Sequence, residues 1–164
     1  MNFQAFEDYL QGLCVSHTDL QHGAGGRQSF IRLFSNDELN SLAERPNPYI
    51  VIVENVTARP VGDVQENKYV QNWTITFLGK ANPVSSSPTT NRDGVIQTAW
   101  DIMMQFIARI KKDWEDDQCG MLKGLDWRMN WRIVQDMELE NNYGWELQIN
   151  QTIKAPDYDP AKWI

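Results

Sequence analysis

Positive charge is scarce in this sequence of 164 residues, because 15 lysines and arginines stand against 22 aspartates and glutamates, for a formal net charge of −7. Proteins that bind nucleic acids normally carry a basic surface that neutralises phosphates. The deficit of positive charge is spread along the whole chain. The composition therefore argues against tight binding of DNA or RNA, although DNA can pass an acidic surface without being held by it.

Cysteine and long apolar runs are also scarce. Cys14 and Cys119 are too few for a disulfide framework, and no segment reaches the ~18 apolar residues that span a bilayer. The first 13 residues lack the basic start of a secretion signal and carry Glu7 and Asp8 inside their apolar pattern. We expect a soluble protein of a reducing compartment, with one domain over residues 1–154 and an extended tail over residues 155–164.

Histidine, with two copies, offers few candidates for chemistry. Cys14, His17 and His22 have a spacing that could supply three zinc ligands, yet no second cysteine lies near them. We favour a small buried thiol and two loop histidines, and we expect no metal and no cofactor. The glycine-rich residues 23–26 follow no predicted strand and precede no helix, so they indicate a hinge rather than a phosphate cradle.

Hydrophobic periodicity, by contrast, is clear. Helical spacing predicts a helix over residues 2–13, and a capping box at Ser35 and Glu38 predicts another that stops before Pro46. Residues 28–34 alternate and favour a short strand. Two hairpins are predicted, one joining residues 49–59 to 68–78 and one joining 127–133 to 143–153. A long helix over residues 94–116, capped by Asp93, lies between them.

These elements, in the order α-β-β-α-β-β, predict an α+β fold. We expect a two-layer sandwich in which two hairpins form a mainly antiparallel sheet and flank one long central helix. The apolar stripe of that helix, which includes Trp114, should cover the sheet. Its extra flank, formed by Ile96, Trp100 and Ile107, makes the stripe wider than one sheet face needs, which favours a protein contact. The predicted interface residues are Trp100, Met104, Ile107, Tyr158 and Trp163.

Two polar segments beside the long helix are further candidates. Residues 82–93, which contain Ser85, Ser86 and Ser87, predict a long mobile loop. Glu115, Asp116 and Asp117 form an acidic run at the C-terminal end of the helix, where the dipole disfavours negative charge. The run is either a solvated helix end or an acidic lining. No recognisable triad or nucleophile elbow accompanies the serines, so we expect no catalytic residues.

The order of elements, the acidic charge and the polar loop resemble the tail-terminator, or tail-completion, proteins of long-tailed bacteriophages; head–tail connector and minor tail proteins are similar. The likeness covers most of residues 2–154, and segments 28–45 and 155–164 depart from it. The resemblance implies a non-enzymatic structural protein that forms a ring, usually of six subunits, on the tail tube and joins it to the head. It also implies partners in the tube and the head connector, passage of DNA, and a virion component assembled in the bacterial cytoplasm.

Two other functions stay open. Trp127 and Trp131 share a strand face with Met129 and Ile133, which favours a core, but a binding module for carbohydrates or other ligands would leave Trp127, Trp131 or Trp145 exposed. A small enzyme would use His17, His22 and nearby carboxylates.

Overall fold

The fold is α+β, as the sequence predicts. The computed structural model describes residues 3–32, 48–54, 56–61, 68–82, 87–116, 120–136 and 141–154. The predicted helix at Ser35 and the tail over residues 155–164 lie outside these ranges. The elements are α1 (Phe3–Ser16), η1 (Ala24–Gly26), β1 (Phe30–Arg32), β2 (Tyr49–Val53), β3 (Thr57–Val61), β4 (Lys68–Lys80), α3 (Pro88–Glu115), η2 (Gly120–Leu122), β5 (Leu125–Asp136) and β6 (Asn142–Lys154).

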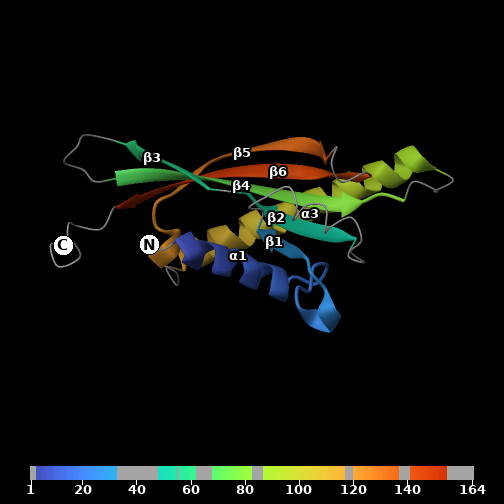
Figure 1. Ribbon diagram of the computed structural model, residues 1–164, viewed down its shortest axis with the longest axis horizontal. Helices are drawn as coiled ribbons and strands as arrows, with labels where there is room; N and C mark the ends of the chain where they lie inside the picture. Colours follow the sequence, from blue (N-terminus) through green and yellow to red (C-terminus); the bar gives the residue numbers. More distant parts are fainter. Residues whose placement is uncertain are drawn as a thin grey trace, which may run out of the picture.

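One six-stranded sheet dominates the described part of the chain (Figure 1). Its strands follow the order β1-β2-β4-β6-β5, and β3 also pairs with β4. The long strands β4 and β6 form the centre, paired from Lys68 opposite Lys154 to Lys80 opposite Asn142. All pairs are antiparallel except β1 with β2, which is parallel. The short strand expected within residues 28–34 is therefore present as β1.

The single strand predicted over residues 49–59 is wrong, because the structure has two strands there. β2 pairs with the C-terminal half of β4 and β3 with its N-terminal half. Val53 lies opposite Ile75 and Thr57 opposite Asn72, so the segment between β2 and β3 holds one residue more than β4 does. An extra residue of this kind bends a strand and interrupts its ladder.

Both described helices pack on the same face of the sheet (Figure 1). Phe6 of α1 meets Trp73 with ring centroids 4.7 Å apart, and Phe106 of α3 meets Phe77 at 5.2 Å. Trp73 and Phe77 are separated by an even number of positions along β4, so both side chains point to the same side of the sheet. The main core lies between this face and the helices. A second, smaller group of buried side chains occupies the opposite face: Ile31, Ile50, Ile52 and Leu78.

The long helix begins earlier than predicted. α3 starts at Pro88, so Asp93 lies within the helix rather than capping it, and the loop predicted over residues 82–93 is shorter. Ser87 occupies the cap position without a side-chain capping hydrogen bond. Proline at the first helical position is favourable because its missing N–H would be unpaired there in any case. None of the described helices is long and apolar enough to cross a membrane.

Candidate functional site

An apolar surface lies where α3 runs beside the terminal strand β5. We define the α3–β5 surface as Trp100 and Met104 of α3, Trp131 and Ile133 of β5, and Trp145 of β6. Trp131 lies opposite Leu147, and Ile133 opposite Trp145. Leu147 is fully buried, so these β5 side chains point to the core side of the sheet. Nevertheless Trp131 is 48% exposed and Ile133 58% exposed.

The predicted core position of Trp131 and Ile133 is therefore wrong. α3 packs mainly over β4 and β6, so neither α1 nor α3, the two α-helices that the structure describes, covers this part of the outermost strand. Trp114 is a similar correction: it belongs to the predicted buried stripe but is 42% exposed, and its ring contacts Trp127 at 5.6 Å. Large apolar side chains that share one exposed area often mark a binding surface.

Trp100 joins the helix to the sheet at the centre of this surface. Its ring centroid lies 4.6 Å from that of Trp145 and 6.1 Å from that of Trp131. The indole N–H of Trp145 donates to the backbone carbonyl of Ile96 at 3.1 Å, which fixes β6 to α3. Trp100, on the extra flank of the helix, is therefore half-buried against the sheet, and its assignment to a subunit contact stays a prediction.

The edge of the sheet at β5 is long. β5 has 12 residues and is the terminal strand of the described sheet, so it is paired on one side by β6. A bulge between Asp126 and Asn130 interrupts this pairing, and regular pairing resumes from Asn130 to Asp136. β3, by contrast, has five residues and includes Pro60. Short length, proline and bulges protect an edge from pairing with another chain. β5 is long and has no proline, and its bulge lies toward its N-terminal end, before Asn130.

Charged side chains on β5 point to the other face of the sheet. Arg132 pairs with Glu146 directly opposite it at 2.8 Å, a favourable cross-strand pairing of opposite charges. Arg128 pairs with Asp126 at 2.7 Å, and its hydrogen bonds lower the pKa of Asp126 to about 2. Arg132 lies on the other face of the sheet, so it adds no charge to the α3–β5 surface, whose defining side chains are all apolar.

The predicted interface residues lie partly on this surface. Met104 is exposed beside Trp100, one helical turn further along α3, and Ile107 is half-buried against the main core. Tyr158 and Trp163 lie outside the described residues. Their assignment to a subunit contact stays a prediction.

The predicted acidic and serine positions lie at the two ends of α3. Glu115 is exposed and lies 3.8 Å from Lys111, and Asp116 is the exposed C-terminal cap residue. Asp117, Ser85 and Ser86 are outside the described residues, and Ser87 precedes α3. The mobility and the lumen role predicted for these residues stay predictions.

Cys14 is a buried thiol, as expected, and burial raises its pKa far above the usual value. His22 organises the turn before β1, because its Nδ1 atom accepts the backbone N–H groups of Ser29 and Phe30 at 3.1 and 3.2 Å. His17 directly follows α1, and its ring centroid lies 5.7 Å from that of Phe106. Among the described residues, no group of three or more His, Cys, Asp or Glu side chains is close enough to hold a metal ion.

A comparison with known protein families matches no family model, and a search of curated proteins finds no similar sequence.

Proposed function

We propose that the protein is a non-enzymatic structural subunit that assembles with copies of itself through the α3–β5 surface. In its specific form, it is a phage or prophage tail terminator or head–tail joining protein that forms a ring on the tail tube. The observation that carries the proposal is the exposure of Trp131 and Ile133 on β5, the terminal strand of the described sheet. Burying such side chains against a second subunit removes apolar surface from water, and each Å² removed contributes about 25 cal/mol to the free energy of association.

The geometry of the surface supports a contact between folded subunits. Trp100 is held by Trp131 and Trp145, so the surface is already ordered before a partner arrives. Rigid aromatic anchors of this kind dominate the energy of protein interfaces. A ring requires head-to-tail contacts, in which the α3–β5 surface of one subunit meets a different surface of the next.

The layout supports the specific form of the proposal. The hairpins β3–β4 and β5–β6 lie in one sheet, and α3, which links them in the sequence, packs on one face together with α1. This arrangement is compatible with the layout of elements on which the resemblance to tail terminators rests. The partners in this form are the tail tube and the head connector, and the protein is a virion component assembled in the host cytoplasm. With a net charge of −7, a ring of such subunits repels the phosphates of DNA that passes through it.

The proposal is tested by the mass of the protein in solution with Trp131→Glu as the key variant. Wild-type protein should form a discrete oligomer, with the mass of a closed ring, in light scattering and native mass spectrometry. A stable interface needs roughly 1,200–2,000 Å² of buried surface, so a charge at its centre should leave Trp131→Glu monomeric. Its circular dichroism should not change, because about half of the Trp131 side chain is already in water. Trp100→Glu is a poorer test, since Trp100 is half-buried and packs against Trp131 and Trp145, so its replacement also disturbs the fold.

Val15→Glu is the matched control, because Val15 is equally apolar and exposed but lies on α1. This variant should assemble like wild type. Wild-type protein that stays monomeric at high concentration would contradict self-assembly. A Trp131→Glu variant that assembles normally would contradict the assigned surface.

A second candidate function is favoured by one specific observation. The exposed indole of Trp131 beside Trp100 is what a stacking platform for a sugar ring or another flat ligand requires. A ligand-binding module predicts that wild-type protein is monomeric and that soluble oligosaccharides change tryptophan emission in wild type but not in Trp131→Ala. An assembly protein predicts that wild-type protein is oligomeric and that soluble oligosaccharides leave its tryptophan emission unchanged.

A further inference from the structure

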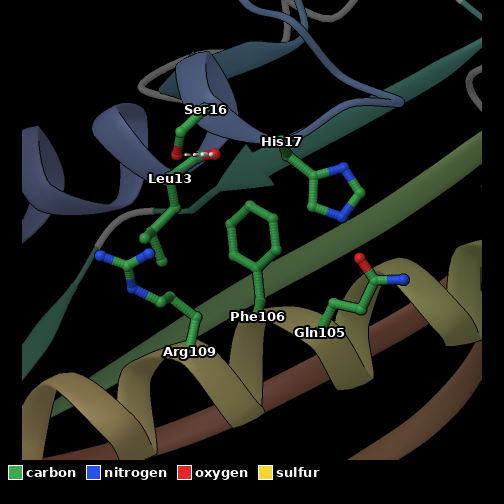
Figure 2. Close-up of a pocket in the computed structure, with 6 residues that line it drawn as sticks. All are labelled: Leu13, Ser16, His17, Gln105, Phe106 and Arg109. Carbon is green, nitrogen blue, oxygen red and sulfur yellow. Dashed lines mark hydrogen bonds between the residues drawn. The ribbon is translucent and has the colours of Figure 1, made fainter.

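A cavity of about 180 Å³ lies between the C-terminal end of α1 and the middle of α3, away from the α3–β5 surface (Figure 2). Figure 2 shows Phe106 at its centre, with His17 and Gln105 on one side of the ring and Leu13 and Arg109 on the other. Ser16, the last residue of α1, completes the lining. The walls therefore combine two apolar side chains with four polar ones.

The protonation of His17 follows from its hydrogen bond. The backbone N–H of Asp19 donates to Nδ1 of His17 at 3.2 Å, so Nδ1 acts as an acceptor and carries no proton. The proton of the neutral ring is then on Nε2. This nitrogen is buried and has no hydrogen-bond partner among the described residues. An N–H group buried without an acceptor costs about 1–3 kcal/mol, which a suitable ligand atom would recover.

Arg109 and Gln105 add further donors. Nε of Arg109 contacts both carboxylate oxygens of Asp113 at 2.9 Å, and the hydroxyl of Tyr9 donates to the same carboxylate at 2.8 Å. Within the described part of the chain, the two terminal nitrogens of Arg109 and the carboxamide of Gln105 make no hydrogen bond. Ser16 donates its hydroxyl proton to backbone carbonyls of α1. The lining is therefore rich in donors, and its one cation, Arg109, is 60% exposed and pairs with Asp113 through Nε, which leaves its terminal nitrogens for a ligand.

We propose that this cavity binds a small carboxylate with a compact apolar body. The carboxylate oxygens accept hydrogen bonds from Arg109 and Gln105, and the apolar part lies against Phe106 and Leu13. His17, whose buried Nε2 atom has no hydrogen-bond partner among the described residues, belongs to the same lining. Guanidinium and carboxylate make charge-assisted hydrogen bonds, which are among the strongest available to an oxygen ligand.

The volume sets the size of the ligand and its affinity. An apolar cavity of about 150 Å³ holds one benzene molecule, so a cavity of this size fits an aryl or short branched carboxylate. A ligand of about nine non-hydrogen atoms at roughly 0.3–0.4 kcal/mol per atom has a Kd of about 1–10 mM. Benzoate is therefore a suitable probe.

The test is a titration of the full chain, labelled with ¹⁵N, with sodium benzoate at constant ionic strength. Backbone amide signals of Ser16, His17, Gln105, Phe106 and Arg109 should shift and saturate. Benzamide has the same shape but no charge, and it should bind at least about tenfold more weakly. Long-range ¹H–¹⁵N spectra of the imidazoles should show the His17 proton on Nε2.

Two variants separate the cavity from the rest of α3. Arg109→Gln should weaken benzoate about tenfold and Gln105→Ala about threefold. Gln105 is exposed, so its replacement leaves the fold intact even if Arg109→Gln disturbs the contact with Asp113. Lys111→Gln removes another cation from α3 and should leave benzoate binding unchanged. The proposal is overturned if no saturable shift occurs, if the shifts lie elsewhere, if benzamide binds equally, or if Gln105→Ala and Arg109→Gln both bind like wild type.

Discussion

Gly144 is the position where the structure predicts the sharpest effect of a single methyl group. It lies on β6 opposite Leu78 and next to Trp145 of the α3–β5 surface. A Cβ at this position would overlap the carbonyl oxygen of Phe77, come within 2.9 Å of its carbonyl carbon and lie 3.1 Å from Cα of Leu78. All three atoms are backbone of β4, so no side chain can turn aside, and Gly144→Ala must separate the central strands.

The size of the effect follows from the ladder that is disturbed. Moving β6 from β4 by about an ångström weakens two or three neighbouring backbone hydrogen bonds, each with a net value of about 1 kcal/mol. Gly144→Ala should therefore lower the free energy of unfolding by about 3 kcal/mol. For a chain of this length that corresponds to a fall of about 6–12 °C in Tm. Thermal unfolding followed by circular dichroism measures it.

Gly94→Ala is the matched control, because Gly94 lies exposed within α3 and a Cβ there meets nothing within 4 Å. Alanine is the better helix former, so this variant should gain about 0.5–1 kcal/mol. If Gly144→Ala leaves Tm unchanged, or if both variants shift it in the same direction, the close approach of β4 and β6 at this point is refuted.

Two further predictions concern stability and pH. Burial alone would raise the pKa of Asp113, but hydrogen bonds from Arg109 and Tyr9 outweigh this effect and lower the pKa below its ordinary value of 3.8. The ionised carboxylate therefore stabilises the folded state at pH values above 3.8. This stabilisation is lost as the pH falls through the lower pKa of the folded state. Asp113→Asn should lower the free energy of unfolding by about 1–2 kcal/mol at pH 7. When this free energy is measured by urea unfolding at several pH values, it should fall less steeply at acid pH in the variant than in wild type. An equally steep fall would contradict the role of the Asp113 carboxylate. His22→Ala should cost about 2 kcal/mol, because the buried N–H of Ser29 and that of Phe30 lose their acceptor. Urea unfolding at neutral pH measures this loss, and a variant as stable as wild type would show that the turn does not depend on the imidazole.

Alternating and helical patterns predicted the elements well where one face of an element is buried along its whole length. Tyr143 to Ile153 alternates and is β6, and the stripe from Val95 to Ile110 faces the sheet from α3. Trp131 and Ile133 show the limit of the method. Alternation assigns a side chain to a face, but whether that face is covered depends on the path of a helix distant in sequence.

Other features were missed for local reasons. Ser87 followed by Pro88 is a start signal for a helix, and it was hidden in a stretch rich in serine and threonine. The break between β2 and β3 becomes visible only from their pairing with β4, and the sequence of residues 49–59 alone does not indicate that pairing. The cavity beside His17 is formed by residues 13–17 and 105–109, and no pattern within either segment indicates the other.

The central ladder of β4 and β6 has a kinetic consequence. β4 can pair with β3, and β6 with β5, early in folding, because each pair is joined in a hairpin. The sheet becomes continuous only when β4 meets β6, and this closes a loop that contains all of α3 and β5. The entropy cost of closing this loop comes before the favourable contacts between the two strands are made. Folds dominated by pairings between strands distant in sequence therefore form slowly. The two hairpins are therefore expected to form first, and the rate of folding is set by the step that joins them.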